Sequence, residues 1–246
     1  MSKIAIIGGT GLTSLNGLEI TNREICQTPF GEPSGVLLRG MLAGQEVIFL
    51  PRHGQSHTIP PHKVNYRANI WLLKEAGVQY VIAVNAVGSI HKDMLPGDLV
   101  IPDQIIDYTT SRINTFFEDG LKQVTHIDFT EPYCEKLRHA LIKCANKNKL
   151  NLSSQATYGA SEGPRLETAQ EINRFENDGC DIVGMTGMPE AALARELELC
   201  YASICVVANA AAGRSAEPLT MDMIEKNLVS GIAKARDVLE KVIPEL

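Results

Sequence analysis

Gly184-Met-Thr-Gly-Met-Pro-Glu190 is the stretch that decides the fold of this chain. It ends a short apolar run at 181–185 and opens a helical pattern at 188–199, with Pro189 in the first turn, where proline is tolerated. A second apolar run, Tyr201 to Asn209, comes directly afterwards. Open α/β sheets bind their ligands at the carboxyl ends of strands. The sequence therefore predicts a small-molecule site at the sheet edge where these two strands end.

The rest of the chain alternates between strand-like and helical patterns. Short β-rich runs and longer helical patterns follow one another, the former at 3–7, 47–50, 80–84 and 98–102, the latter at 64–76, 131–148, 168–178 and 221–242. Thr168 and Glu171 form a capping-box pattern. This alternation predicts the α/β class: a twisted mixed or mostly parallel sheet with helices on both faces, in a single domain over residues 1–246.

Composition limits the partners that the chain can have. The 246 residues are 44% hydrophobic and 21% charged, with a net charge of −6, which is typical of a globular protein with a full core. The sequence contains no basic run, which argues against a nucleic-acid partner. It also contains no apolar run long enough for a membrane span and no signal peptide, so we expect a cytoplasmic protein without membrane contact.

The six cysteines form neither a C-x-x-C pair nor a zinc-type spacing. Cys144, Cys200 and Cys205 lie in apolar runs. We therefore expect reduced thiols that pack in the core of the protein, rather than disulfides or metal ligands.

Two polar segments that follow strands suggest an anion site. Gly8-Gly9-Thr10-Gly11 lacks the G-x-G-x-x-G dinucleotide pattern, so its N–H groups and the Thr10 hydroxyl suit a single phosphate, with a plain tight turn as the equal alternative. Arg52 and His53 follow the next strand. Arginine binds two phosphate oxygens at once, whereas the alternative is an exposed polar turn. Two further histidines lie nearby, but Arg52 would repel a cation, so we expect no metal.

Polar and small residues also follow the later strands. Asn85 and Ala86 end a central strand, where small side chains and free N–H groups let a ligand approach closely. Glu167 precedes a helix and either complements the helix dipole or accepts a hydrogen bond from a ligand. Met185 suits core filling or packing on a sugar. For Glu190, at the start of a helix, a dipole role is sufficient.

In this order, the segments resemble those of the trimeric purine nucleoside phosphorylases, in the branch that includes 5′-methylthioadenosine phosphorylase. The resemblance covers nearly the whole chain and implies the nucleoside phosphorylase fold, with a partly barrel-like sheet. Its blocks are Ile6-Ile-Gly-Gly-Thr-Gly-Leu12, Thr28-Pro-Phe-Gly31, Arg52-His-Gly54, His57-Thr58, Lys63-Val-Asn-Tyr66, Ala68-Asn-Ile-Trp71, Pro96-Gly-Asp98, Glu162-Gly-Pro-Arg165, Met185-Thr186 with Pro189-Glu190, and Cys200-Tyr-Ala-Ser-Ile204.

The resemblance implies a role for each candidate residue. Phosphate, a co-substrate, would be held by Thr10, Arg52, His53, Asn85, Ala86 and Thr186. Met185 would lie against the ribose, and Leu166 falls where the family packs an aromatic ring on the base. His57 falls where the family reaches into a neighbouring subunit's site, which implies a homotrimer. Neither a metal nor an organic cofactor is implied.

The purine end departs from the adenine-specific branch of the family. That branch has Ala-Thr-Asp-Tyr-Asp where this chain has Val207 to Ala211, so both aspartates are missing. Glu167 and Asn209 instead resemble the pair of the 6-oxopurine phosphorylases. Glu167 would accept the N1–H, and Asn209 would donate to O6 and bond N7 in the transition state. Adenine would leave these groups unpaired, which hydrogen-bonding sites penalise strongly. Asn209, Glu167 and His53 are the implied catalytic residues.

The other end of the sugar gives a second indication. The stretch Leu219 to Ile224 has no histidine for a 5′-hydroxyl, and Met221 and Ile224 would form an apolar pocket for a 5′-methylthio group. The implied reaction is phosphorolysis of 5′-methylthioinosine to hypoxanthine and 5-methylthioribose 1-phosphate. The alternatives are a general inosine/guanosine phosphorylase, a methylthioadenosine phosphorylase, a nucleotide-binding dehydrogenase and a non-catalytic binding protein of the same fold.

Overall fold

The computed structural model describes residues 3–12, 14–216 and 220–246, without the side chain of Met221. The strands are β1 (Ile4–Gly8), β2 (Glu19–Glu24), β3 (Leu37–Leu42), β4 (Gln45–Pro51), β5 (Tyr80–Ser89), β6 (Leu99–Val100), β7 (Gln104–Asp107), β8 (Leu152–Ser153), β9 (Thr157–Ala160), β10 (Ile182–Gly184) and β11 (Cys200–Ala210). The helices are η1 (Pro61–Lys63), α1 (Tyr66–Glu75), α2 (Glu135–Lys147), α3 (Ala169–Asn177), α4 (Glu190–Glu196), α5 (Met221–Val242) and η2 (Ile243–Glu245).

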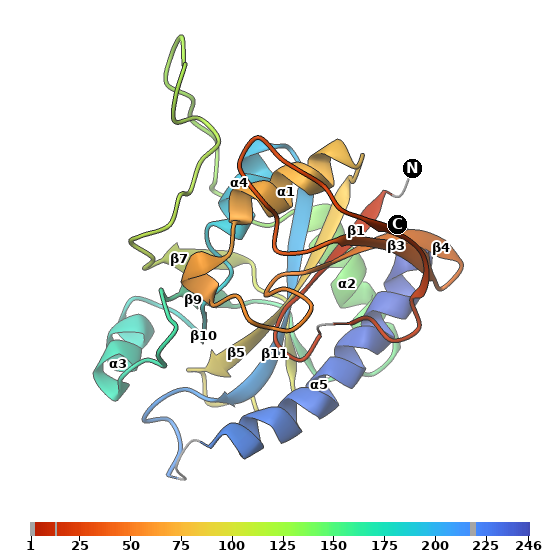
Figure 1. Cartoon of the computed structure of the whole chain (residues 1–246). Coiled ribbons are helices and arrows are strands. Elements are labelled where there is room, and N and C mark those ends of the chain that lie inside the picture. Colours follow the sequence, from red (N-terminus) through yellow and green to blue (C-terminus); the bar gives the residue numbers. More distant parts are fainter. Residues whose placement is uncertain (1–2, 13, 217–219) are drawn as a thin grey trace.

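Strand β5 is the centre of a mixed sheet (Figure 1). On one edge, β1 pairs in parallel with Tyr80–Val84, and β10 pairs antiparallel with Gly88 and Ser89. On the other edge, β11 runs parallel to β5 along its length. The sheet branches at β5 and does not close, since β2-β3-β4-β1 extends one way and β10-β9-β7 the other. The polar loops after β1, β4 and β10 therefore meet at the point along β5 where its pairing with β1 ends and its pairing with β10 begins.

Strand β5 is longer than the sequence pattern predicts. It continues to Ser89 because Asn85, Ala86 and Val87 pair in register with Cys205–Val207 of β11. Asn85 and Ala86 therefore lie inside a strand, and the prediction that they end it was wrong. The predicted strand at 98–102 shrinks to the two residues of β6.

Helices cover both faces of the sheet, as predicted (Figure 1). Helices α1 and α4 pack over one face, in an apolar cluster that includes Ile70 and Leu193. Helices α2 and α5 pack over the other face, in a cluster that includes Leu141 and Leu239. Both clusters form because these helices turn a stripe of apolar side chains toward the sheet. The predicted capping box of α3 is also confirmed, with both hydrogen bonds present.

One expectation about the cysteines was wrong. Cys134 and Cys200 form a disulfide, with their Cα atoms 5.1 Å apart. Cys134 precedes α2, and its N–H donates to the carbonyl oxygen of Tyr201 at 2.8 Å, which brings the start of α2 against the start of β11. The sequence separation of 66 positions conceals this proximity. Cys26, Cys144, Cys180 and Cys205 are free thiols.

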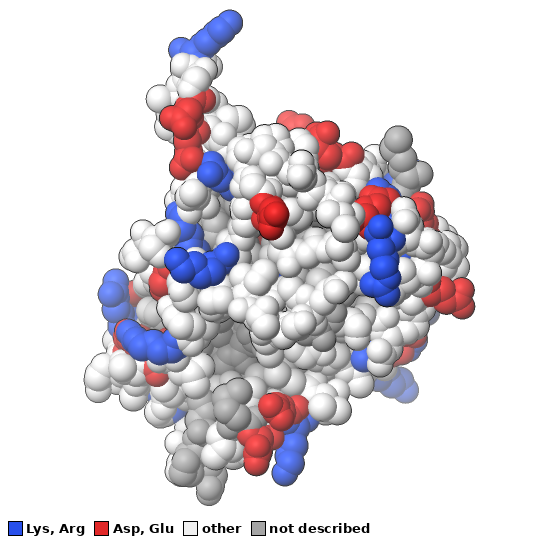
Figure 2. Space-filling view, viewed as in Figure 1, with Lys and Arg blue, Asp and Glu red and all other residues white. Residues whose placement is uncertain are grey.

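A long segment between β7 and α2 extends away from the body of the molecule (Figure 1). On the face shown in Figure 2 this extension has both acidic and basic side chains, and the middle of the face is largely uncharged. Within the described part of the chain, no helix is both long enough and apolar enough to cross a membrane.

Candidate active site

A cavity of about 500 Å³ lies where β1, β4, β10 and β11 end. The predicted site residues that line it are Thr10, Arg52, His53, His57, Ala86, Leu166, Glu167, Met185, Thr186, Asn209 and Ile224. Asn85 is not among the lining residues, and the side chain of Met221 lies outside the described part of the structure. The fold thus brings together eleven of the candidates from segments up to about 200 residues apart in the sequence.

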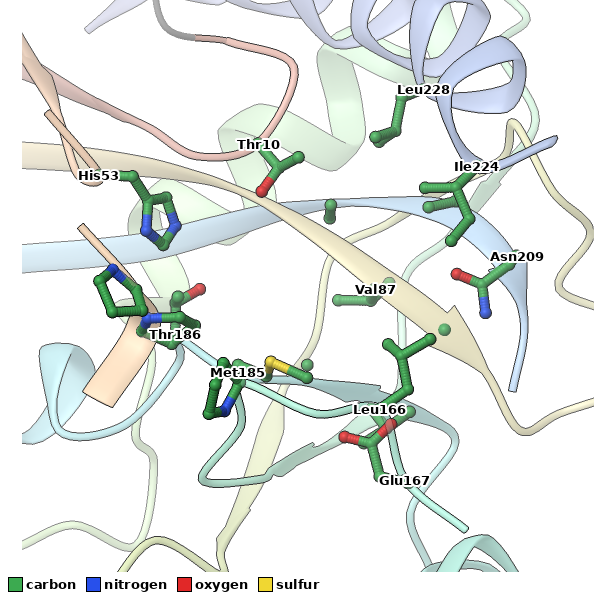
Figure 3. A pocket seen from close by; sticks show the side chains of 18 of the residues that line it. Thr10, His53, Val87, Leu166, Glu167, Met185, Thr186, Asn209, Ile224 and Leu228 are labelled. Carbon is green, nitrogen blue, oxygen red and sulfur yellow. The ribbon is translucent and has the colours of Figure 1, made fainter. Parts of the chain in front are cut away.

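The candidates separate into two ends of this cavity (Figure 3). Thr10, His53 and Thr186 gather at one end, and Glu167 and Asn209 lie at the other. The side chains of Met185 and Val87 lie between them. We call the first the hydroxyl end and the second the amide end. The hydroxyl end suits an anion, and the amide end suits a planar heterocycle with both donors and acceptors.

Arg52 at the hydroxyl end is held by a buried partner. Its Nε and Nη2 each donate to the Glu190 carboxylate at 2.7 Å, its Nη1 donates to the Val84 carbonyl at 3.0 Å, and both charged side chains are fully buried. The Tyr201 hydroxyl donates to the same carboxylate at 2.9 Å. Burial alone would lower the pKa of Arg52, but the ion pair with Glu190 raises it above its ordinary value. Two of the five guanidinium hydrogens are not used by these bonds.

A dipole role alone therefore does not account for Glu190. Glu190 does begin α4, but this helix has seven residues, and its carboxylate makes two short bonds to Arg52. In the core a charge is tolerated only when it is paired and hydrogen-bonded. The sequence contains an indication of this pair, since Arg52 follows β4 and Glu190 comes after β10, and both strands end at the same edge of the sheet.

His53 is neutral and has a fixed tautomer. Its Nδ1 lies 2.8 Å from the carbonyl oxygen of Ile59. Burial, followed by the charge of Arg52, lowers the pKa of His53 to about 4. Since a carbonyl can only accept, Nδ1 holds the single proton and Nε2 is left as a hydrogen-bond acceptor. The hydroxyl end thus offers an acceptor as well as donors.

His57 lies beside His53 in the same chain. The two ring centroids are 4.8 Å apart, and His57 has a positive φ of 53°. His57 borders the cavity of its own chain, and its reach into a neighbouring subunit stays a prediction. Among residues 3–12, 14–216 and 220–246, no three His, Cys, Asp or Glu side chains come close enough together to hold a metal ion.

Thr186 is oriented from behind by Asn85. The Asn85 side-chain amide donates to the Thr186 hydroxyl oxygen at 2.8 Å, and the Thr186 N–H donates to the Tyr158 hydroxyl at 3.3 Å. Because the Thr186 oxygen accepts from Asn85, its own hydrogen can be donated to another acceptor. Asn85 is fully buried and supports this hydroxyl instead of lining the cavity. The sequence did not indicate Tyr158.

The glycine loop after β1 packs directly against Arg52. A Cβ atom at Gly9 would lie 2.7 Å from Arg52 Nη1 and 2.6 Å from the Val84 carbonyl oxygen. The loop is also a tight turn, with the Leu12 N–H donating to the Gly9 carbonyl at 3.0 Å. The tight turn is therefore confirmed, and phosphate binding by this loop stays a prediction. The turn places Thr10 at the cavity, and the missing side chain of Gly9 lets the guanidinium approach.

Within the described part of the chain, the polar side chains at the amide end bond near neighbours in the sequence. The Glu167 carboxylate accepts from the Ser161 hydroxyl at 2.5 Å. The Asn209 amide donates to the carbonyl of Ala210 at 2.7 Å, just after an irregularity in the pairing of β11 with β5. Such an irregularity turns a side chain away from its regular direction. Leu166 is 50% exposed at this end.

Apolar side chains without a sequence signal complete the cavity. They come from the segment after His57, from β5 and from α5, and are Ile59, Pro60, Pro61, Val87 and Leu228. Met185 packs against the loop before Glu167 so closely that a Cβ atom at Gly163 would lie 2.5 Å from its sulfur. The middle of the cavity is therefore apolar.

Comparisons with known proteins agree with this geometry. Residues 3–244 match the family model described as the Phosphorylase superfamily. The chain is 53% identical over 243 residues, 99% of each chain, to a probable S-methyl-5′-thioinosine phosphorylase of Pseudomonas syringae. It is 46% identical to the 6-oxopurine nucleoside phosphorylase of Pyrococcus furiosus, covering 99% of this chain and 91% of that one.

A similar solved structure is a methylthioadenosine phosphorylase of Schistosoma mansoni in complex with adenine. It superposes with a TM-score of 0.95 at 35% sequence identity, covering all of this chain and 92% of that one. The fold predicted from the resemblance is thereby confirmed.

Proposed function

Because this chain belongs to the Phosphorylase superfamily, we propose that it cleaves a purine nucleoside by phosphorolysis and that its preferred substrate is 5′-methylthioinosine. One observation carries this proposal. A single cavity has hydroxyl groups and an arginine at one end and a carboxylate and an amide at the other, with Met185 between them. Those are the groups that phosphate, a sugar and a 6-oxopurine would require, in that order.

At the hydroxyl end, phosphate would be bound by Thr10, Thr186 and the unused hydrogens of Arg52. The acceptor Nε2 of His53 would take a hydrogen bond from a protonated phosphate oxygen, which a site made only of donors could not do. Asn85 would act indirectly, by directing the Thr186 hydroxyl hydrogen toward the anion. These contacts would hold the phosphate beside C1′ of the sugar, and such positioning is a large part of the catalysis of a two-substrate reaction.

At the amide end, the leaving purine gains negative charge as the bond to C1′ breaks. Asn209 would donate to N7 or O6 and stabilise this charge, and Glu167 would accept the N1–H. Adenine presents the reverse pattern at N1 and position 6. It would leave both groups unpaired, and sites built for hydrogen bonding discriminate against such substrates by factors of roughly 10⁴–10⁵.

The 5′ end of the sugar would face helix α5. Ile224 and Leu228 of this helix line the cavity. A 5′-hydroxyl that found no partner there would cost about 1–3 kcal/mol, whereas a methylthio group would be favoured. This difference supports methylthioinosine over inosine.

We also propose that the reaction needs no metal or organic cofactor, since an arginine and a neutral histidine with acceptor Nε2 occupy the anion end. A homotrimer, implied by the resemblance at His57, is likewise a proposal. Light scattering on the purified protein tests it, and a fully active monomer would contradict it.

The decisive experiment measures release of the base from methylthioinosine, inosine and methylthioadenosine side by side, with and without phosphate and with a chelator. We expect methylthioinosine to give the highest kcat/KM, no turnover without phosphate or arsenate, and no effect of the chelator. Equal rates on inosine would favour the broader activity in the name of the Pyrococcus relative. A preference for methylthioadenosine would contradict the roles of Glu167 and Asn209.

A further inference from the structure

Arg112 is a nearly buried arginine that the proposed reaction does not use. It lies in the segment between β7 and α2. Its side chain is 2% exposed. It is not among the residues that line the cavity, and the segment around it has no periodic pattern that would have indicated it.

The guanidinium of Arg112 donates to four backbone carbonyls from two separate segments. Nη1 donates to Met185 at 2.7 Å and to Met188 at 2.5 Å. Nη2 donates to Glu162 at 2.7 Å and to Ser161 at 3.3 Å. Four acceptors from two segments thus converge on one planar side chain, which only the fork of donors in an arginine can serve.

The charge of Arg112 is balanced locally. Its Nε lies 3.7 Å from the Glu162 carboxylate, which itself accepts from the Ser111 hydroxyl at 2.5 Å and the Thr110 N–H at 2.9 Å. The guanidinium also lies over the ring of Tyr66, 5.4 Å from its centroid. These contacts anchor the side chain from the side opposite the carbonyls.

The two segments that Arg112 joins lie side by side at the cavity, since they follow the paired strands β9 and β10 and the Ser161 N–H donates to the Gly184 carbonyl at 2.8 Å, and we call them the two walls. One runs from Ser161 to Glu167 and includes Leu166, and the other is the turn at 185–188 that includes Thr186. Ser161 has a direct bond to the Glu167 carboxylate, and Met185 is bonded covalently to Thr186. A shift of the guanidinium would therefore change the distance between the group expected to bind the base and the groups expected to bind sugar and phosphate.

We propose that Arg112 is a positioning residue, which fixes the 161–167 loop against the 185–188 turn and so aligns the bound nucleoside with phosphate. This inference rests on the proposed function for its catalytic consequence. Its structural part, the coupling of the two walls, does not depend on which nucleoside is the substrate.

The test compares Arg112→Lys and Arg112→Ala with a matched control at Arg138. Arg138 is also buried and also donates to two backbone carbonyls, of Pro102 at 2.8 Å and Ser154 at 2.6 Å, but it does not line the cavity or contact its walls. Substitutions at either arginine should lower the melting temperature. Only those at Arg112 should change catalysis in the protein that remains folded.

For the Arg112 variants we expect kcat with methylthioinosine to fall by roughly 10²-fold, the effect of a misplacement of about 1 Å, while the KM for phosphate changes less than about threefold. The lysine variant should recover little, because an ammonium group lacks the planar fork. Added guanidinium at low concentration should restore part of the rate of Arg112→Ala and none of that of Arg138→Ala. Equal losses of kcat at the two arginines would overturn the proposal.

Amide hydrogen exchange supplies a measurement that is independent of activity. Arg112→Ala should increase exchange in both 161–167 and 185–188, and Arg138→Ala should increase it in neither. Unchanged exchange in both walls of Arg112→Ala would overturn the inference even if activity fell. A wild-type protein that turned over no methylthioinosine, but whose Arg112 variant showed the increased exchange, would contradict the proposed function and support the coupling of the walls.

Discussion

The hydroxyl end and the amide end of the cavity are built in different ways. At the hydroxyl end Arg52, Glu190 and Asn85 are fully buried, and they join residues that are about 100 or more positions apart in the sequence. At the amide end Glu167 bonds a residue six positions away, and Asn209 bonds its own neighbour. The first is therefore part of the core, and the second is local structure at the edge of the molecule.

This difference indicates which end can change without loss of the fold. Substitutions in a buried ion pair disturb the core, whereas loops positioned by a rigid scaffold tolerate change and determine specificity. We therefore expect substitutions at the hydroxyl end to alter stability, and those at the amide end to alter the choice of base.

The largest effect is expected for Glu190→Gln. It leaves the Arg52 guanidinium charged and unpaired in the core, which lowers the free energy of unfolding by about 3–5 kcal/mol. Glu171→Gln is the matched control, because Glu171 forms an exposed pair with Arg165 and glutamine can preserve the capping box. The control should lose less than about 1 kcal/mol. Urea unfolding of both variants makes the comparison. Equal losses of unfolding free energy would contradict the assignment of the hydroxyl end to the core.

The next effect concerns pH at the same end. The folded-state pKa of His53 is about 4, below its ordinary value of 6.5, so the unfolded chain binds this proton more tightly. The contribution of the neutral ring to stability is complete above pH 6.5 and is lost as the pH falls toward 4, by up to about 3 kcal/mol. Urea unfolding between pH 7 and pH 4.5 should therefore show a smaller acid loss for His53→Gln than for wild type. His139→Gln, at an exposed histidine, should follow wild type, and parallel curves for all three proteins would contradict a neutral His53.

Sequence patterns predicted the fold better than the arrangement inside the site. The amphipathic pattern of 221–242 predicted both ends of helix α5 correctly. Strand β2 (Glu19–Glu24) was not predicted. It lies at the edge of the sheet with nearly every residue exposed, so its sequence has no alternation of apolar and polar residues. Strand β5 was predicted too short, because its last residues are held by pairing with β11 and β10 rather than by their own propensity.

Within the site, the sequence indicated which segments meet but not which side chains face the cavity. Asn85 and Ala86 are adjacent in β5, and alternation along a strand sends one behind Thr186 and the other to the cavity wall. The sequence near Glu190 indicates only its place at the start of a helix, because its partner Arg52 is 138 positions earlier. Arg112 bonds carbonyls, which every residue has, so no pairing of side-chain types could indicate it.

At the amide end, Asn209→Asp should change the base preference and leave stability nearly unchanged. The carboxylate cannot donate to O6 of a 6-oxopurine, and it can accept from a protonated N7. Loss of one hydrogen bond to a charged group is worth about 1.5–3 kcal/mol, so we expect kcat/KM for methylthioinosine relative to methylthioadenosine to fall by one to two decades. The control is Asn227→Asp, whose amide donates to the carbonyl of Ala208 at 2.9 Å without lining the cavity. An unchanged ratio in a folded Asn209→Asp would show that Asn209 does not bind the base.

The smallest effect is expected for Ser161→Ala, which removes the hydroxyl that orients the Glu167 carboxylate. Because Glu167 is only half-buried, water can replace this donor, and the cost should be about 1 kcal/mol, or roughly fivefold in kcat/KM for methylthioinosine. Thr115→Val is a close control, since the Thr115 hydroxyl donates to the Glu196 carboxylate at 2.6 Å, and Glu196 does not line the cavity. The KM for phosphate should stay constant in both variants, because the short bond of the Ser161 hydroxyl goes to Glu167 at the amide end. If the KM for phosphate rose together with that for the nucleoside, the two ends would act as one unit, and the division between a core-built end and a locally built end would fail.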